Sequence, residues 1–144
     1  MGYRSDVRIM ISKKGFEKLK EYTDKYLKDK DYKYGNLLDE CDISEETKYA
    51  KYIGWNNIKW YEYSNYTDVD AIMNGLDYLK NEDYSYRYAR IGESYDDYEE
   101  HSYESEFYEN EQDLEYPSME RYFDDDYVID NMKSVDDTID KNEI

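Results

Sequence analysis

The residues of this sequence that could do chemistry are carboxylates and tyrosines, and both are dense between Arg90 and Arg121. The 30 residues between these two arginines contain 12 carboxylates, five tyrosines and no basic residue except one histidine. Carboxylates can bind divalent cations, act as acid and base in glycoside hydrolysis, or present negative charge to a basic partner. Each of these chemistries requires a different arrangement of the acids.

Metal binding is disfavoured by the spacing of the candidate ligands. His101 is the only histidine and Cys41 the only cysteine, so no zinc-binding pattern exists. Acidic clusters occur at residues 39–42, 96–100 and 124–126, but none has the spacing of a calcium-binding loop. We therefore interpret these clusters as solvated charge and expect no metal and no cofactor.

Enzymatic signatures are missing as well. With a single histidine, the sequence has little from which to assemble a nucleophile, a base and an orienting group. Neither the G-x-x-x-x-G-K nor the G-x-G-x-x-G phosphate-binding pattern occurs. The acidic composition is compatible with two-carboxylate glycosidase chemistry, but a small acidic domain without a second lobe disfavours it. We expect a protein that is not an enzyme.

The charge is unevenly distributed along the chain. Residues 1–90 contain 16 basic and 17 acidic residues, whereas residues 91–144 contain 3 basic and 20 acidic ones. Acidic disordered segments are poor in aromatic residues, but this chain has 21 tyrosines. We therefore expect an α+β domain over residues 1–92, an ordered acidic extension over 93–129 that packs on or extends the sheet, and a flexible tail over 130–144.

Periodicity predicts the elements of the first domain. Residues 6–12 alternate as a half-buried strand, and Ser12 is placed to cap a following helix. Two stripes of apolar residues at helical spacing predict two amphipathic helices, one before and one after a predicted hairpin. The hairpin consists of two short strands, 47–53 and 57–63, around a turn at 54–57. The first stripe consists of Phe16, Leu19, Thr23, Tyr26 and Leu27, and the second, in a helix opened by Thr67, of Val69, Ile72, Met73, Leu76 and Leu79.

A further alternating segment, residues 84–91, completes the order strand, helix, strand, strand, helix, strand. This order predicts a ferredoxin-like βαββαβ fold, a four-stranded antiparallel sheet with both helices on one face. We expect residues 97–108 to add an edge strand and a short helix to follow Pro117. The predicted core consists of Val7, Ile9, Ile11, Ile58, Trp60, Ala89 and Ile91 together with the helical stripes.

The opposite face of this predicted sheet allows two interpretations. It would present Arg8, Met10, Lys59, Tyr61, Tyr86, Tyr88 and Arg90. Basic and aromatic residues on such a sheet are the components of an RNA- or nucleotide-binding platform, on which bases stack. Alternatively, residues 95–129 cover this face, and their acids pair with Arg8, Lys59 and Arg90. We favour the covered face because the acidic segment follows the last strand directly.

The segments MGYRSDV, IKWY and RIGESYDDYEE carry a resemblance to known proteins. Over residues 1–100, the chain resembles a group of small bacteriophage and mobile-element proteins that begin with MGYRSDV. These proteins carry a RIGE-x-Y-x-D-x-E stretch after a second helix, and the group has no established activity. The resemblance implies a phage context, in which small acidic proteins often inhibit host defence, including restriction enzymes and CRISPR effectors.

These observations lead to one expected function, an acidic and DNA-mimic-like inhibitor that blocks a basic nucleic-acid-binding protein of the host. The partner-binding residues would be Glu93, Asp96, Asp97, Tyr98, Glu99, Glu100, Tyr103, Glu104, Glu106, Tyr108 and Glu109. The net charge of −18 argues against direct binding to DNA or to anionic membranes. One cysteine and the absence of a signal peptide or long apolar run favour the cytoplasm. A self-associating structural protein is a further possibility.

Overall fold

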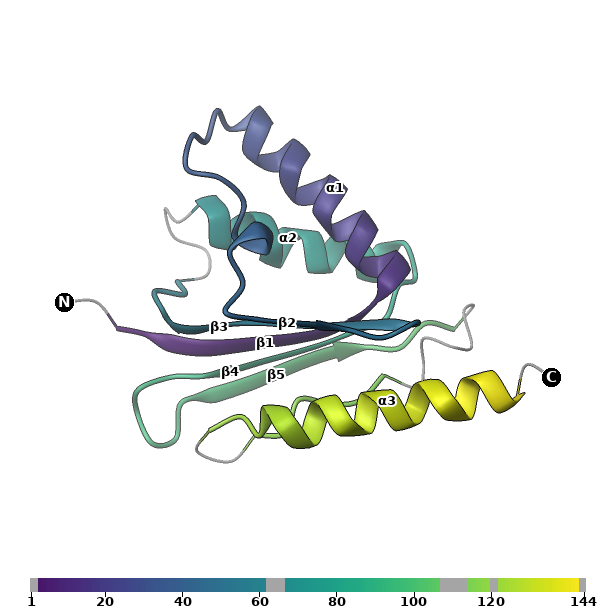
Figure 1. The fold of residues 1–144 in the computed structure, drawn as a ribbon. Coiled ribbons are helices and arrows are strands. Elements are labelled where there is room, and N and C mark those ends of the chain that lie inside the picture. Colours follow the sequence, from purple (N-terminus) through teal and green to yellow (C-terminus); the bar gives the residue numbers. More distant parts are fainter. Residues whose placement is uncertain (1–2, 62–66, 107–113, 120–121, 143–144) are drawn as a thin grey trace.

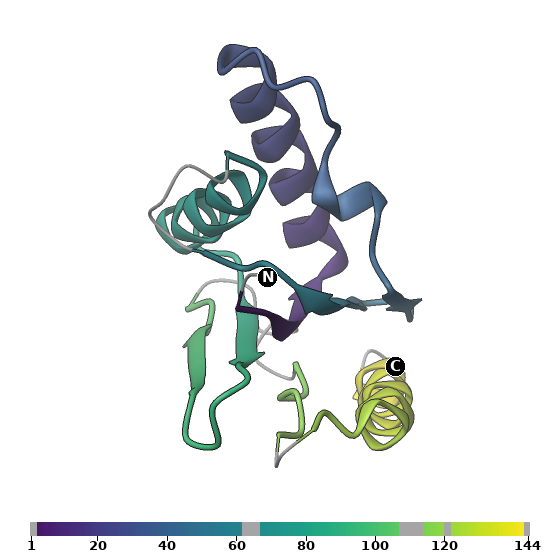
Figure 2. The same cartoon turned by 90° about the vertical axis from the view of Figure 1, so that its left-hand side faces the viewer.

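A five-stranded antiparallel sheet lies between two helices on one face and a third helix on the other (Figures 1 and 2). The structure is a computed structural model, and it describes residues 3–61, 67–106, 114–119 and 122–142. The strands are β1 (Ser5–Ser12), β2 (Ile43–Glu46), β3 (Ala50–Ile58), β4 (Tyr86–Ile91) and β5 (Tyr98–Tyr103), in the sheet order β2-β3-β1-β4-β5. The helices are α1 (Lys13–Asp29), the 3₁₀ turn η1 (Leu37–Asp39), α2 (Thr67–Asn81) and α3 (Asp125–Asn142).

The predicted α+β class is confirmed, but the sheet has five strands and not the four of a ferredoxin-like fold. The first strands and long helices follow the expected order strand, helix, strand, strand, helix, strand. β5 extends the four-stranded sheet at the edge formed by β4, within the range expected for an additional strand. The third long helix, α3, has no counterpart in the predicted fold.

Helices α1 and α2 form as their sequence patterns predict. The Ser12 side chain caps α1 by accepting a hydrogen bond from the Gly15 backbone N–H at 3.0 Å. Leu19 and Thr23 of the first stripe are fully buried. A Cβ on Gly75 of α2 would clash with the Leu19 side chain, so this glycine allows the two helices to approach closely. The cap of α2 would lie at residues 62–66, outside the described residues.

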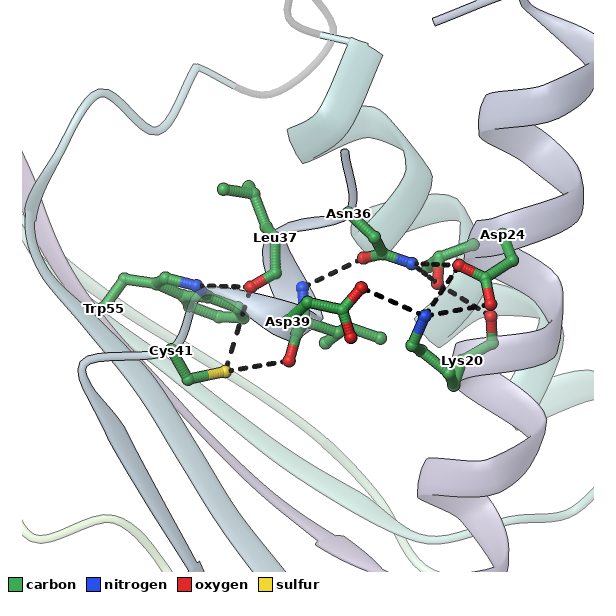
Figure 3. Close-up of polar contacts among 9 residues, drawn as sticks. Lys20, Asp24, Asn36, Leu37, Asp39, Cys41 and Trp55 are labelled. Carbon is green, nitrogen blue, oxygen red and sulfur yellow. Dashed lines mark hydrogen bonds and ion pairs between the residues drawn. The ribbon is translucent and has the colours of Figure 1, made fainter. Parts of the chain in front are cut away.

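The connection from α1 to β2 is fixed by hydrogen bonds to the core (Figure 3). The Asn36 side chain donates to the Thr23 hydroxyl at 2.7 Å and accepts from the Leu38 backbone N–H at 2.9 Å. The Trp55 indole N–H donates to the Leu37 carbonyl at 3.0 Å. These bonds satisfy buried polar groups and thereby hold η1 over the helix-facing side of the sheet.

The predicted hairpin of strands 47–53 and 57–63 is misplaced along the chain, and residues 62–63 lie outside the described residues. Residues 54–57, predicted as a turn, lie inside β3, and the hairpin turn is instead formed by residues 47–49. Gly54 lies opposite Arg8 in the neighbouring strand β1, and a Cβ there would meet the Val7 carbonyl at 2.6 Å. The glycine therefore makes room for the Arg8 side chain, which a turn interpretation cannot reveal.

The predicted orientation of β4 is also wrong. Tyr88 is opposite Ile9, and both side chains belong to the core beneath α1 and α2. Ala89 and Ile91, predicted for that core, pack with Phe123 on the other face of the sheet. Both faces of β4 are buried, so its alternation does not indicate which side faces the helices.

The expected flexible tail, residues 130–144, is wrong for the described part, because residues 130–142 belong to α3. Val128, Met132 and Ile139 are buried against the sheet, at spacings of four and seven residues. This is the period of an amphipathic helix, which the high content of acids obscures. The short helix expected after Pro117 begins later than predicted, because the described residues 117–119 and 122–124 are not helical and α3 begins at Asp125.

Candidate functional site

The turn between β4 and β5 uses two of the expected partner-binding acids for structure. Asp97 and Glu99 both form ion pairs with Arg90, at 2.8 and 2.6 Å. The Tyr3 hydroxyl also donates a hydrogen bond to Asp97. The hydrogen bonds from Arg90 and Tyr3 lower the pKa of the Asp97 carboxyl below its ordinary value. Asp97 and Glu99 are therefore internal partners of the fold.

Tyr103 and Glu104, at the end of β5, are likewise engaged. The Tyr103 hydroxyl donates to Asp83, and this hydrogen bond raises the pKa of Tyr103 to about 12. Glu104 pairs at 2.9 Å with Arg87, whose side chain is only 1% exposed. The Glu104 carboxylate therefore balances a buried positive charge, while most of its own side chain remains in solvent.

Five other expected residues, Glu93, Asp96, Tyr98, Glu100 and Glu106, are exposed. Within the described residues, their side chains have no hydrogen-bond or ion-pair partner. Tyr108 and Glu109 lie outside the described residues. The structure thus separates the expected set into exposed side chains and side chains that hold the fold together.

The β5 side chains do not share one surface. Glu99 and Tyr103 lie on the side of the sheet that carries α1 and α2, because they are opposite Arg90 and Tyr86. Tyr98 and Glu100 lie on the α3 side, opposite Ile91 and Ala89. The expected set is therefore divided between the two faces of the sheet.

α3 contributes acids that the sequence analysis did not include in the site. Asp126, Asp130 and Asp137 are exposed along the helix, whose buried residues face the sheet. Recognising the apolar period of residues 128–139 would have predicted this helix and its acidic outer face.

Other acids anchor α3 to the sheet. Asp125 accepts two hydrogen bonds from the Arg8 guanidinium, at 2.9 and 3.1 Å, and one from the Tyr52 hydroxyl at 2.7 Å. Asp136, only 8% exposed, accepts a hydrogen bond from the Lys48 backbone N–H at 2.7 Å. The N-terminal end and the middle of the helix are thus fixed to β1, β3 and the hairpin turn.

This anchoring closes the face considered as an RNA-binding platform. Arg8 is 3% exposed and lies with its guanidinium 4.9 Å from the centre of the Phe123 ring. Tyr88, another residue of that set, is 1% exposed and lies on the helix-facing side. Arg8 and Tyr88 are therefore buried, and they lie on opposite faces of the sheet, so they form no common platform for bases.

Exposed tyrosines accompany the exposed acids. Of the six large apolar or aromatic side chains that are exposed in the described residues, five follow Gly92. They are Tyr95, Tyr98, Tyr116, Tyr122 and Tyr127. Together with the exposed acids they form what we call the acidic surface. Its acids are Glu93, Asp96, Glu100, Glu106, Asp124, Asp126, Asp130 and Asp137.

Other kinds of site find little support in the described part of the chain. It contains no group of three or more His, Cys, Asp or Glu residues placed to hold a metal ion. Burial raises the pKa of the Cys41 thiol to about 11, which disfavours the reactive thiolate. None of the described helices is both long and apolar enough to cross a membrane. Comparisons with protein-family models, curated proteins and solved structures found no match.

Proposed function

We propose that this protein is a non-enzymatic, phage-type inhibitor whose acidic surface occupies a basic nucleic-acid-binding surface of a host defence protein. CRISPR effectors and restriction systems are the classes of target in view. The observation that carries the proposal is that exposed acids after Gly92 lie along a folded helix, α3, and on and beside the edge strand β5. A folded acidic surface binds with less loss of chain entropy than a disordered acidic tail.

The spacing of the acids supports charge complementarity more than an imitation of the phosphate spacing. Asp126, Asp130 and Asp137 are four and seven residues apart, which corresponds to about 6 and 10 Å along a helix. Duplex DNA has one charge per about 1.7 Å of its axis. The exposed tyrosines would supply the additional contacts, since their rings bury a large area at low entropy cost.

The remainder of the chain acts as the scaffold in this proposal. We assign the strands β1 to β4 and the helices α1 and α2 to a ferredoxin-like core. β5 and α3 extend this core. Inhibition is then steric and electrostatic competition, without a covalent step.

The proposal is tested by neutralising acids that anchor nothing. In the variant Asp126→Asn/Asp130→Asn/Asp137→Asn, three exposed charges are removed from α3. The tagged full chain is used to isolate a DNA-binding protein from a bacterial extract at about 0.05 M NaCl. The affinity of the isolated protein is then measured for the wild-type chain, for the variant and for duplex DNA. We expect the variant to bind about tenfold more weakly, and duplex DNA to displace the wild-type chain.

The matched control is Glu17→Gln/Asp29→Asn/Glu82→Gln, which removes three exposed acids from the α1 and α2 side of the molecule. It should bind nearly as tightly as the wild type. Equal losses in both variants, or simultaneous binding of DNA and this chain to the target, would contradict the proposal. Deleting residues 93–144 is an unsuitable test, because it also removes the partners of Arg8, Arg87 and Arg90.

A further inference from the structure

β5 forms the outer edge of the sheet next to β4 (Figure 2). The backbone N–H of Gly92 donates to the Asp97 carbonyl at 2.7 Å, in register with the β4–β5 ladder. Because hydrogen-bonded pairs alternate in antiparallel strands, the next such pair along the ladder is Arg90 with Glu99. The backbone N–H and C=O groups of Tyr98, Glu100 and Ser102 consequently point away from β4.

This edge lacks several devices that usually prevent strand addition. β5 contains no proline and no lysine, and its register with β4 is continuous over all six residues. Tyr98, Glu100 and Ser102 are exposed, and in the described part of the chain no further strand pairs with the outer side of β5. What the edge does carry is negative charge, from Glu100 in the strand and from Asp96 and Glu106 near its two ends.

A second copy of the chain is a poor occupant of this edge. Antiparallel pairing of two β5 strands through residues 98, 100 and 102 would place Glu100 opposite the Glu100 of the second copy. Like charges directly opposite each other destabilise a pair of strands, and each chain has a net charge of −18. The same charge attracts a segment with lysines or arginines at alternate positions.

We propose that β5 is a docking strand to which an extended basic segment of a partner protein adds as a sixth strand. This inference rests on the proposed function and specifies how its partner is held. Backbone hydrogen bonds to Tyr98, Glu100 and Ser102 provide the affinity, and a basic side chain opposite Glu100 provides selectivity.

A synthetic peptide with alternating lysine and threonine serves as the probe for the full chain. We expect hydrogen exchange of the Tyr98, Glu100 and Ser102 amides to slow at least tenfold at saturating peptide. Glu99 and Tyr103, whose amides already face β4, should change little. The control peptide has N-methyl groups on alternate residues, along the edge that would pair with β5, and should give no protection. Protection by both peptides, or by neither, would overturn the proposal.

A substitution in the protein tests the same contact independently. Ser102→Pro removes one outward N–H and leaves the β4–β5 ladder intact, since edge strands tolerate proline at such positions. Ser102→Ala is the matched control. The peptide should lose at least tenfold in affinity for Ser102→Pro and little for Ser102→Ala, and equal affinities would contradict the proposal. Should Ser102→Pro not fold, the peptide pair alone decides.

The two proposals fail in distinguishable ways. A target bound by the acidic surface with equal affinity in Ser102→Pro and Ser102→Ala would refute edge docking and leave inhibition intact. A peptide that protects the β5 edge in a protein that competes with no nucleic acid would refute inhibition and leave edge docking intact.

Discussion

The two faces of the sheet are held by different interactions. On the side of α1 and α2, one continuous apolar core extends from β1 and β3 to both helices and includes both tryptophans. On the α3 side, two smaller clusters surround Met10 and Phe123. Hydrogen bonds and ion pairs to Asp125, Asp136 and Asp140 supplement them.

This difference shows how residues 91–144, with 20 acids and 3 basic residues, fold onto the nearly neutral residues 1–90. A few of its acids find fixed partners at the sheet, and the others remain in solvent, where their charge is available to a partner. The neutral half is stabilised by apolar burial, whereas the acidic half depends also on specific charge pairing.

The largest effects that we predict are losses in the free energy of unfolding, from one substitution on each face. On the α3 face, the substitution is Asp125→Ala. This change leaves the guanidinium of Arg8 buried without its carboxylate, which costs about 3 kcal/mol. On the other face, Leu19→Ala leaves a cavity and costs a similar amount, about 3 kcal/mol. Both losses are measurable as the free energy of unfolding in urea.

The origin of the two losses separates them. Adding Arg8→Met to Asp125→Ala removes the unpaired charge and should recover about 1 kcal/mol or more. Adding the same Arg8→Met to Leu19→Ala should only destabilise the protein further. Equal effects of Arg8→Met in both backgrounds would show that the α3 face does not depend on this charge pair.

A smaller contrast is expected between two glycines, one on each face. Gly54→Ala places a methyl group against the Val7 carbonyl and the Arg8 side chain, so it should destabilise the protein by about 1–3 kcal/mol. Gly75→Ala meets the end of the Leu19 side chain, which can move, and gains about 1 kcal/mol in helix propensity. Thermal unfolding of both variants checks this order, and a more damaging Gly75→Ala would reverse our interpretation.

Patterns with one buried face were predictable from the sequence. β1, α1 and α2 each have a regular apolar stripe, and all three were placed nearly correctly. For α1, the capping residue Ser12 is an additional local start signal. β4 and the β2–β3 hairpin were not, because their details depend on tertiary contacts. Gly54 resembles a turn residue until Arg8 is placed next to it.

The candidate site was partly predictable for a similar reason. Glu93, Asp96 and Glu100, which were predicted to bind a partner, are exposed, and acids without a partner in the fold are expected to remain in solvent. Composition does not reveal which acids meet an arginine after folding, as Asp97 and Glu99 do with Arg90. The acids of α3 were missed because their helix was interpreted as a tail.

The smallest effect that we predict is the local response of the two faces to acid. Hydrogen bonds from Lys48 and Tyr49 lower the pKa of Asp140 in α3, and those from Arg90 and Tyr3 lower the pKa of Asp97. A carboxyl with a lowered folded-state pKa stabilises the fold above its unfolded pKa, near 4. This stabilisation is lost as the pH falls through the folded-state value. We therefore expect α3 and the β4–β5 turn to loosen below about pH 4.

Hydrogen exchange and tryptophan fluorescence together measure this response. Exchange of the α3 amides should accelerate at a higher pH than that at which the fluorescence changes, because Trp55 and Trp60 are buried in the core of the other face. Asp140→Asn should make α3 exchange faster at neutral pH and flatten its acid dependence. A single transition shared by the α3 amides and both tryptophans would mean that the two faces unfold as one cooperative unit, and that their different interactions do not give them separate stabilities.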